Sequence, residues 1–111
     1  PFMVLSATAR AGVAAFSKAI SNELAINNIS VNVICPGGVL TDRLISLVKN
    51  RAKNEKREYE EVLKESEQSI PIKRFASVDE IAKVVSFLCS NEGGYITGVQ
   101  LSVDGGLTRS F

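Results

Sequence analysis

The run over residues 29–35 constrains the fold more than any other feature, because it is β-branched, mostly apolar and followed at once by a proline. Such a run favours a strand that is buried on both faces, and strands of that kind usually lie in parallel sheets. Pro36 cannot donate to the hydrogen-bond ladder of a sheet, and Gly37 and Gly38 free the backbone for a sharp turn. The sequence therefore predicts a buried parallel strand over residues 29–35 that ends in an open loop.

Before this strand, the larger apolar residues recur every three or four positions, which predicts a helix over residues 6–27. These residues are Val13, Phe16, Ile20 and Leu24. Many of the remaining positions hold alanine, and Gly12 is smaller still. A second helix can therefore approach closely, so this face suits an interface as well as a core.

Residues 41–68 are strongly charged and contain few apolar side chains. Their pattern predicts two amphipathic helices with little apolar anchorage. Two interpretations stay open at this point. The segment is either a mobile flap over a site or simply a solvated face of the molecule.

A further helix begins at Ser77, because a serine followed three residues later by Glu80 forms a capping box. Its apolar stripe consists of Ile81, Val84, Val85 and Leu88. A short connection then leads to a second strand over residues 99–103. The order helix, strand, helices, strand is typical of an α/β layered fold with right-handed crossovers. Because two strands alone leave their outer edges unpaired, we expect further strands from another chain or from an absent segment of this one.

Composition and charge argue against several classes of function. The 111 residues are 45% hydrophobic, which is enough for one modest core, and no apolar run approaches the roughly 18 residues of a membrane span. A net charge of +1 gives no reason to expect nucleic acid or a membrane as a partner. Cys35 and Cys89 lie far apart and the sequence has no histidine, so we expect neither a metal site nor a disulfide. Buried, reduced thiols in a cytoplasmic protein are the better interpretation.

The chain contains three stretches whose order and spacing belong together: ISVNVICPGGVLTDR, IPIKRFASVDEIAKVVSFLCS and YITGVQLSVDGG. Together they resemble the short-chain dehydrogenase/reductase family, and the resemblance covers essentially the whole chain. It implies an α/β fold, the C-terminal part of a Rossmann-type doubly wound parallel sheet with helices on its faces. It also implies that residues 1–111 are the C-terminal half of a single domain and that residues 41–70 form a helical substrate lid. The N-terminal half, with its dinucleotide loop, would then be absent from this sequence.

The resemblance places a Tyr-x-x-x-Lys pair at the start of the first helix, and counting back from Pro36 at the usual family separation reaches Ser6 and Arg10. The chain therefore departs from the family at both positions. A phenol, with a pKa of about 10, exchanges a proton with a carbonyl or alcohol far more easily than an aliphatic hydroxyl does. Arginine keeps the positive charge and can hold ribose hydroxyls, but it cannot relay a proton. The alternative for Ser6 is a plain N-terminal helix cap.

The loop after the predicted strand forms the other half of the site that the resemblance implies. The resemblance implies that Pro36, Gly37, Val39 and Thr41 hold the nicotinamide carboxamide of NAD or NADP. The position agrees with a general rule, since ligands of open α/β sheets bind beyond the carboxyl ends of the strands. The alternative is an ordinary turn in which Thr41 caps a helix that begins at residue 42.

Two functions follow from these observations. The first is an NAD(P)-dependent oxidoreductase that moves a hydride between nicotinamide and a small-molecule carbonyl or secondary alcohol, by similarity of the 3-oxoacyl-(acyl-carrier-protein) reductase type. Its catalytic residues would be Ser6 and Arg10, and its cofactor residues Arg10 and the loop after the strand. The second is a non-catalytic nucleotide-binding subunit, or a structural subunit, of the same fold that has lost the tyrosine. Under either reading the resemblance implies a cytoplasmic dimer or tetramer.

Overall fold

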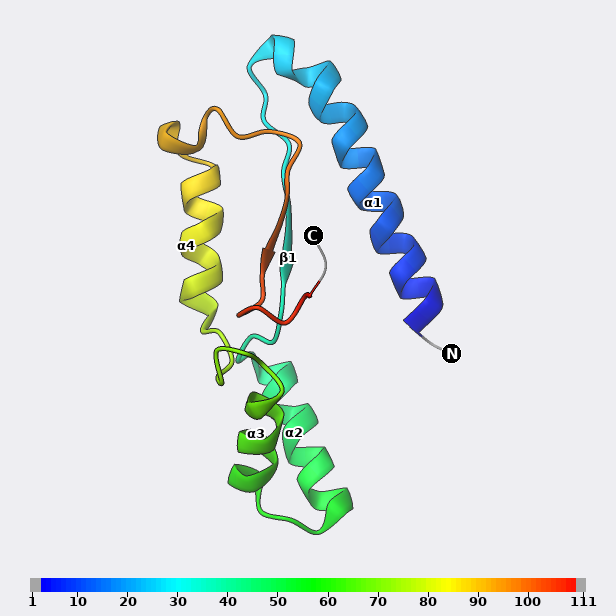
Figure 1. Cartoon of the computed structure of the whole chain (residues 1–111), viewed down its shortest axis with the longest axis vertical. Helices are drawn as coiled ribbons and strands as arrows, with labels where there is room; N and C mark the ends of the chain where they lie inside the picture. The colour runs from blue at the N-terminus through cyan, green and yellow to red at the C-terminus, as the bar shows by residue number, and fades with distance from the viewer. Residues whose placement is uncertain (1–2, 110–111) are drawn as a thin grey trace. The chain divides into compact units, whose positions relative to one another are not determined.

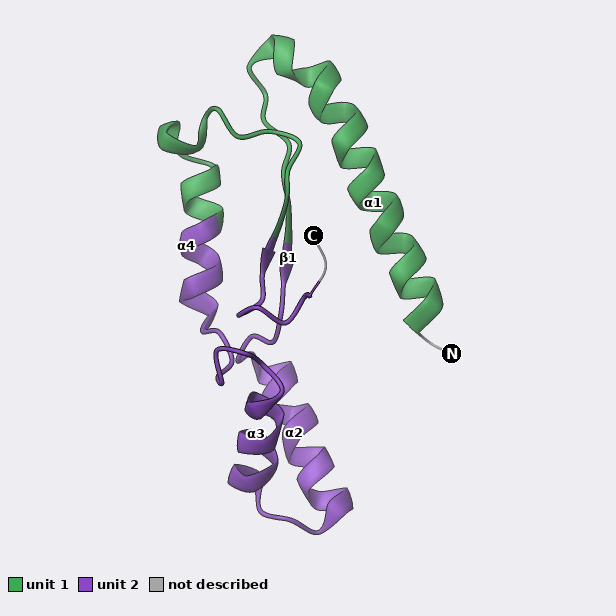
Figure 2. Cartoon of the chain, in the orientation of Figure 1, with its two compact units in different colours: residues 1–34, 85–101 green, residues 35–84, 102–111 purple. Residues whose placement is uncertain are grey.

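The structure is a computed structural model that describes residues 3–109. Its elements follow one another along the chain in Figure 1. They are α1 (Met3–Leu24), the 3-10 turn η1 (Ala25–Asn27), β1 (Val33–Pro36), α2 (Asp42–Glu55), α3 (Tyr59–Gln68), α4 (Val78–Leu88), the 3-10 turn η2 (Asn91–Gly93) and β2 (Gln100–Val103). The chain divides into two compact units, residues 1–34 with 85–101 and residues 35–84 with 102–111 (Figure 2).

The sheet consists of β1 and β2, which are neighbours. The N–H of Val33 donates to the carbonyl of Val99 at 2.9 Å, and the N–H of Gly37 donates to Val103 at 3.0 Å. Because both partners advance together along the sequence, the strands are parallel.

The predicted strand over residues 29–35 is wrong at its start, since β1 begins at Val33. Side chains make some of the contacts before that point. The Val31 N–H donates to the hydroxyl of Thr97 at 3.0 Å, and the Asn32 amide donates to the carbonyl of Ile96 at 2.9 Å. The expected burial on both faces is also wrong, because the residues of β1 are half-buried or exposed. Within residues 3–109, β1 has a strand neighbour along one edge only, which leaves its side chains partly uncovered.

Helix α1 begins at Met3 and ends at Leu24, where a 3-10 turn and the left-handed Asn28 (φ 58°) stop it. Asparagine tolerates this conformation better than most residues. The apolar stripe that predicted the helix is largely uncovered, since Val13 is 58% and Phe16 is 64% exposed. The helix is therefore formed where the pattern predicts it, while its apolar side has no cover among the described residues.

Helices α2 and α3 pack on each other around a small core of their own. Val48, Ala52 and Val62 are buried in it, with Tyr59 and Leu63 packed against them. The prediction of two amphipathic helices is confirmed. The two helices bury Val62 fully between them. How firmly the pair is anchored to the rest of the protein stays a prediction.

Helix α4 starts with the predicted capping box. The Ser77 N–H donates to Oε2 of Glu80 at 2.8 Å, and the Glu80 N–H donates to the hydroxyl of Ser77 at 3.2 Å. Of its predicted stripe Leu88 is buried, whereas Val85 is 43% exposed.

Two further findings hold for the described part of the chain. No helix there is both long enough and apolar enough to cross a bilayer. The same residues contain no group of three or more histidine, cysteine, aspartate or glutamate side chains that could hold a metal ion.

Candidate functional site

Residues 36–41, here called the exit loop, leave β1 along a path that two close contacts define. A Cβ atom built on Gly37 would lie 2.7 Å from the Cα of Asp104, in the segment after β2. A Cβ atom built on Gly38 would lie 2.6 Å from Cε1 of Phe75. Real Cβ atoms do not approach other atoms so closely, so both positions require glycine for proximity. The two glycines of the predicted open loop are therefore packing residues as well.

The middle of the exit loop pairs with the segment before α4. Val39 and Ala76 form a parallel bridge. In it, the Ala76 N–H donates to the carbonyl of Gly38 at 3.0 Å, and the Leu40 N–H donates to the carbonyl of Ala76 at 2.9 Å. The bridge therefore uses the groups on either side of Val39. Within residues 3–109 the N–H of Val39 itself has no hydrogen-bond acceptor, while its carbonyl accepts from the Thr41 N–H at 2.8 Å.

Thr41 ends the exit loop and caps α2. Its backbone is extended, and its Oγ1 accepts a hydrogen bond from the Leu44 N–H at 3.3 Å. The capping role considered for Thr41 is thus confirmed. Because the hydroxyl acts here as an acceptor, its own hydrogen is still available as a donor. Cap and ligand contact are compatible at this residue.

Asp104 holds the turn that packs against Gly37. Its carboxylate accepts from the Gly106 N–H at 3.0 Å and from the Thr108 N–H at 2.8 Å. Hydrogen bonds from the side chain and backbone of Thr108, followed by those from the backbone of Gly106 and Leu107, lower the pKa of Asp104. The turn is therefore kept in place by a charged carboxylate near neutral pH.

The pair Ser6 and Arg10 forms a direct contact on α1. Nη2 of Arg10 donates to Oγ of Ser6 at 2.6 Å, and Nε donates to the same oxygen at 3.3 Å. Ser6 lies inside the helix, so the interpretation as its N-terminal cap is wrong. Since the arginine occupies the serine oxygen as an acceptor, the serine O–H is left to donate elsewhere.

The structure brings together the members of each half of the predicted site. Ser6 and Arg10 lie in the unit of residues 1–34 and 85–101, whereas the exit loop lies in the unit of residues 35–84 and 102–111. The convergence of the two halves on one cleft stays a prediction.

Sequence reasoning missed Phe75 and Ala76, which shape the exit loop. Both residues lie between α3 and α4, where no periodicity marks them. The one local signal is a large apolar residue shortly before the capping serine. It indicates burial but does not indicate which residue it contacts. Phe75 is indeed buried.

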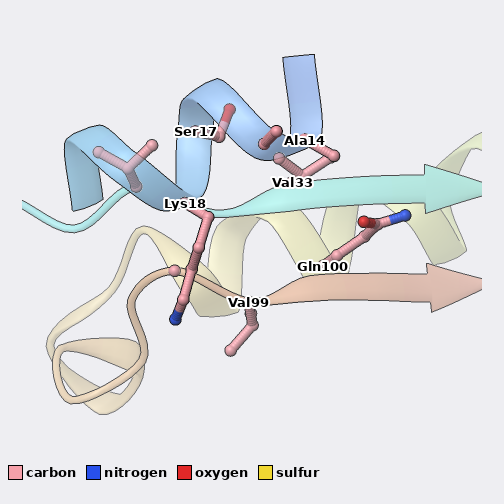
Figure 3. A pocket seen from close by; sticks show the side chains of 9 residues that line it. Ala14, Ser17, Lys18, Val33, Val99 and Gln100 are labelled. Atoms are coloured by element: carbon pink, nitrogen blue, oxygen red, sulfur yellow. The ribbon is translucent and has the colours of Figure 1, made fainter. Parts of the chain in front are cut away.

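A hollow of about 260 Å³ lies elsewhere, in the first unit, between α1 and the strand segments (Figure 3). Apolar side chains such as Val33 and Val99 form much of its wall, with Ser17, Lys18 and Gln100 as polar members. None of the predicted site residues lines it. The hollow is therefore separate from the predicted chemistry.

Comparison with known proteins identifies the family. Residues 2–108 match the sequence model of the enoyl-(acyl carrier protein) reductase family. The chain is 42% identical over 94 residues to the NADPH-dependent reductase BacG of Bacillus subtilis, covering 85% of this chain and 36% of the relative. It is 38% identical over 100 residues to the 3-oxoacyl-(acyl-carrier-protein) reductase FabG of Aquifex aeolicus, covering 90% of this chain and 36% of the relative.

Solved structures agree. A short chain dehydrogenase family protein from Francisella tularensis has a TM-score of 0.84 at 35% identity, with 90% of this chain and 41% of that chain covered. L-sorbose reductase from Gluconobacter frateurii has a TM-score of 0.85 at 36% identity, with 91% and 39% covered. The predicted fold class, the C-terminal part of a Rossmann-type α/β sheet, is confirmed. The chain spans 36% of the length of BacG and 36% of the length of the Aquifex FabG. It belongs to the short-chain dehydrogenase/reductase family.

Proposed function

We propose that the protein is an NAD(P)-dependent oxidoreductase that transfers a hydride between a nicotinamide cofactor and a carbonyl or secondary alcohol. The observation that carries the proposal is the N–H of Val39, which the bridge to Ala76 leaves without an acceptor among residues 3–109. It lies in a loop that leaves the carboxyl end of a parallel strand, where α/β sheets bind their ligands. The names of the relatives, NADPH-dependent reductase among them, support the same cofactor class.

The exit loop fits a carboxamide, which has one acceptor oxygen and an amide group with two donors. The Val39 N–H and the Thr41 O–H are donors suited to the oxygen, and the Val39 carbonyl retains a lone pair for the amide. The glycines at 37 and 38 keep side chains away from the backbone, and Pro36 fixes the start of the loop. When bound, the nicotinamide ring supplies or accepts the hydride.

Arg10 and Ser6 have separate tasks in this proposal. Arginine has five N–H donors, and those not used on Ser6 are assigned to the ribose hydroxyls of the cofactor. The O–H of Ser6 is assigned to an oxygen of the substrate as a hydrogen-bond donor. Serine replaces a tyrosine of the family here, so we expect positioning to contribute more than proton transfer.

Substrate, lid and assembly extend the proposal. Relatives named 3-oxoacyl-(acyl-carrier-protein) reductase and acetoacetyl-CoA reductase favour a 3-oxoacyl-like substrate. We assign residues 1–111 to the C-terminal half of one Rossmann-type domain and residues 41–70 to its substrate lid. A homo-oligomer is part of the same proposal, and the alanines and Gly12 of α1, which allow a second helix to approach closely, support it. A cytoplasmic location is part of the same proposal. The burial expected for the two thiols is wrong, since Cys35 is half-buried and Cys89 is exposed.

The test is nicotinamide absorbance on the intact protein. NADPH and NADH are each offered with a panel of ketones that includes acetoacetyl thioesters, and oxidation of the cofactor is followed over time. Turnover of at least one ketone is expected. Tight cofactor binding without turnover of any ketone would instead favour a non-catalytic nucleotide-binding subunit. No binding of either cofactor would contradict the oxidoreductase and favour a structural subunit.

A further inference from the structure

The ring of Phe75 lies against the backbone of Gly38. Phe75 is only 8% exposed. Its Cε1 lies 2.6 Å from the position that a Cβ atom of residue 38 would take, which is too close for a real Cβ atom. Ile70, which is also buried, lies behind it at 3.7 Å from the same point. A flat aromatic surface therefore limits how far the exit loop can move toward the end of α3.

The residue after this ring fixes the orientation of the same loop. Ala76 donates to the carbonyl of Gly38 and accepts from the N–H of Leu40. A parallel bridge of this kind uses the peptide groups that flank Val39. The N–H of Val39 is consequently directed away from Ala76. Ring contact and bridge act on one short stretch of backbone, residues 38–40.

We propose that Phe75 is a positioning residue for cofactor binding. Its ring limits how closely the backbone of Gly38 can approach the segment before α4. The adjoining bridge then directs the Val39 N–H toward the carboxamide. The bridge between Val39 and Ala76 joins the segment before α2 to the segment after α3. It therefore holds the base of the α2–α3 hairpin and the proposed cofactor contact in place together. The inference rests on the proposed function for the identity of the ligand, but the support of the loop itself is independent of any ligand.

The experiment is a double-mutant cycle on the intact protein, with NADPH affinity measured by the fluorescence of the bound cofactor. Gly38→Ala places a Cβ against the ring and should weaken NADPH binding about tenfold, the effect of losing one good hydrogen bond. Phe75→Val removes the support and should weaken binding to a similar degree. The double variant should bind more tightly than Gly38→Ala alone, because the added methyl group then fills space that the ring has left.

Two matched controls separate positioning from general damage. Phe87→Val makes the same truncation at a side chain that is 48% exposed on α4, and it should leave NADPH affinity unchanged. Gly37→Ala meets the backbone of Asp104 at 2.7 Å, so adding Phe75→Val to it should restore nothing. If Phe75→Val does not fold, Phe75→Leu replaces it, since the branched side chain keeps more volume but lacks the flat ring.

Hydrogen exchange of the cofactor-free protein gives a second readout. The Leu40 and Ala76 amides, which form the bridge, should exchange faster in Phe75→Val than in the wild type. Unchanged exchange at both amides, together with a double variant no better than Gly38→Ala, would overturn the proposal. If the wild-type protein binds NADH but not NADPH, NADH serves as the probe in the same cycle. If it binds neither, the proposed function fails, and the exchange rates alone decide whether Phe75 supports the loop.

Discussion

Arg51 on α2 donates a hydrogen bond to Glu65 on α3, with 2.6 Å between Nη2 and Oε1. This contact belongs to a closed ring of alternating charges. Arg51 also contacts Glu55 at 2.7 Å, Glu55 contacts Arg57 at 3.1 Å, and Arg57 returns to Glu65 at 2.6 Å. The ring connects both helices with the turn between them, outside their apolar core.

We expect Glu65→Gln to lower the melting temperature of the hairpin region, because it removes the negative charge from both of the ring's contacts to α3 and leaves a single acceptor oxygen. Hydrogen bonds from Arg51 and then Arg57 lower the pKa of Glu65, so the wild-type carboxylate is charged at neutral pH. The side chains are partly exposed, and salt screens such pairs. The difference from wild type should therefore shrink in about 1 M salt. Thermal unfolding at low and high salt measures it.

Glu61→Gln is the matched control, since Glu61 is more exposed and reaches Arg57 only at 3.8 Å. It should have a smaller effect at either salt concentration. A loss for Glu65→Gln that is equally large in high salt would mean that packing, not the charge ring, accounts for the change.

The capping glutamate of α4 should make stability depend on pH. The Arg74 side chain, followed by the Ser77 backbone, lowers the pKa of Glu80 from 4.5 to about 2. Because the folded state holds the proton less tightly than the unfolded state, this stabilisation is present above about pH 4.5 and is lost as the pH falls toward about 2. Thermal unfolding of the wild type and Glu80→Gln should therefore differ near neutral pH and converge in acid.

A constant difference across that range would contradict the prediction. Asp79→Asn is a suitable control, because Asp79 lies in the same first turn of α4 and makes neither the contact with Arg74 nor the capping box.

Local signals predicted much of this fold, because they depend on neighbours a few residues away. The capping box at Ser77, the cap at Thr41 and the two helices after it all follow from short-range hydrogen bonds and spacing. Where partners lie far apart in the sequence, prediction failed. The start of β1 depends on Thr97 and Ile96, which no pattern around residue 31 can indicate.

The candidate site divides in the same way. Arg10 and Ser6 are one helical turn apart, so their contact is readable from spacing alone. The contact of Gly38 with Phe75 joins a residue before α2 to a residue after α3. A glycine in a loop also indicates flexibility at least as readily as close packing. Tertiary contacts of that kind had to come from the structure.

Lys73 has a left-handed backbone, with a φ of 62°. This conformation costs a residue with a side chain about 1–2 kcal/mol, and glycine adopts it without that cost. We therefore expect Lys73→Gly to raise the free energy of unfolding by up to about 1 kcal/mol, even though it removes the contact of the ammonium group with the Gln68 carbonyl at 2.6 Å. Denaturant unfolding measures the change. Lys73→Ala keeps the backbone cost and loses the contact, so it should give no gain.

Ser6→Ala should separate chemistry from stability. The serine lies inside α1 and accepts from Arg10, so its loss removes no helix cap. Alanine is the better helix former, and we expect the free energy of unfolding to stay equal or rise by about 0.5 kcal/mol. Turnover should fall while NADPH affinity remains nearly intact. Steady-state kinetics and cofactor titration on the intact protein measure both.

A clear loss of stability in Ser6→Ala, with turnover unchanged, would make Ser6 a structural residue only. Replacing Ser6 by tyrosine together with Arg10 by lysine tests the departure from the family directly. If the missing phenol limits the reaction, this double variant should have higher reductase activity than the wild type.

Thr41 allows its cap and its proposed ligand contact to be measured separately. Thr41→Val removes the oxygen that accepts from Leu44, and should cost about 1 kcal/mol of stability as well as NADPH affinity. Thr41→Ser keeps both functions and should resemble the wild type. Thr41→Asp keeps an acceptor for the cap but has no hydroxyl hydrogen, so it should retain stability and still bind NADPH more weakly. If Thr41→Asp binds NADPH as tightly as Thr41→Ser, then Thr41 acts through the helix cap alone.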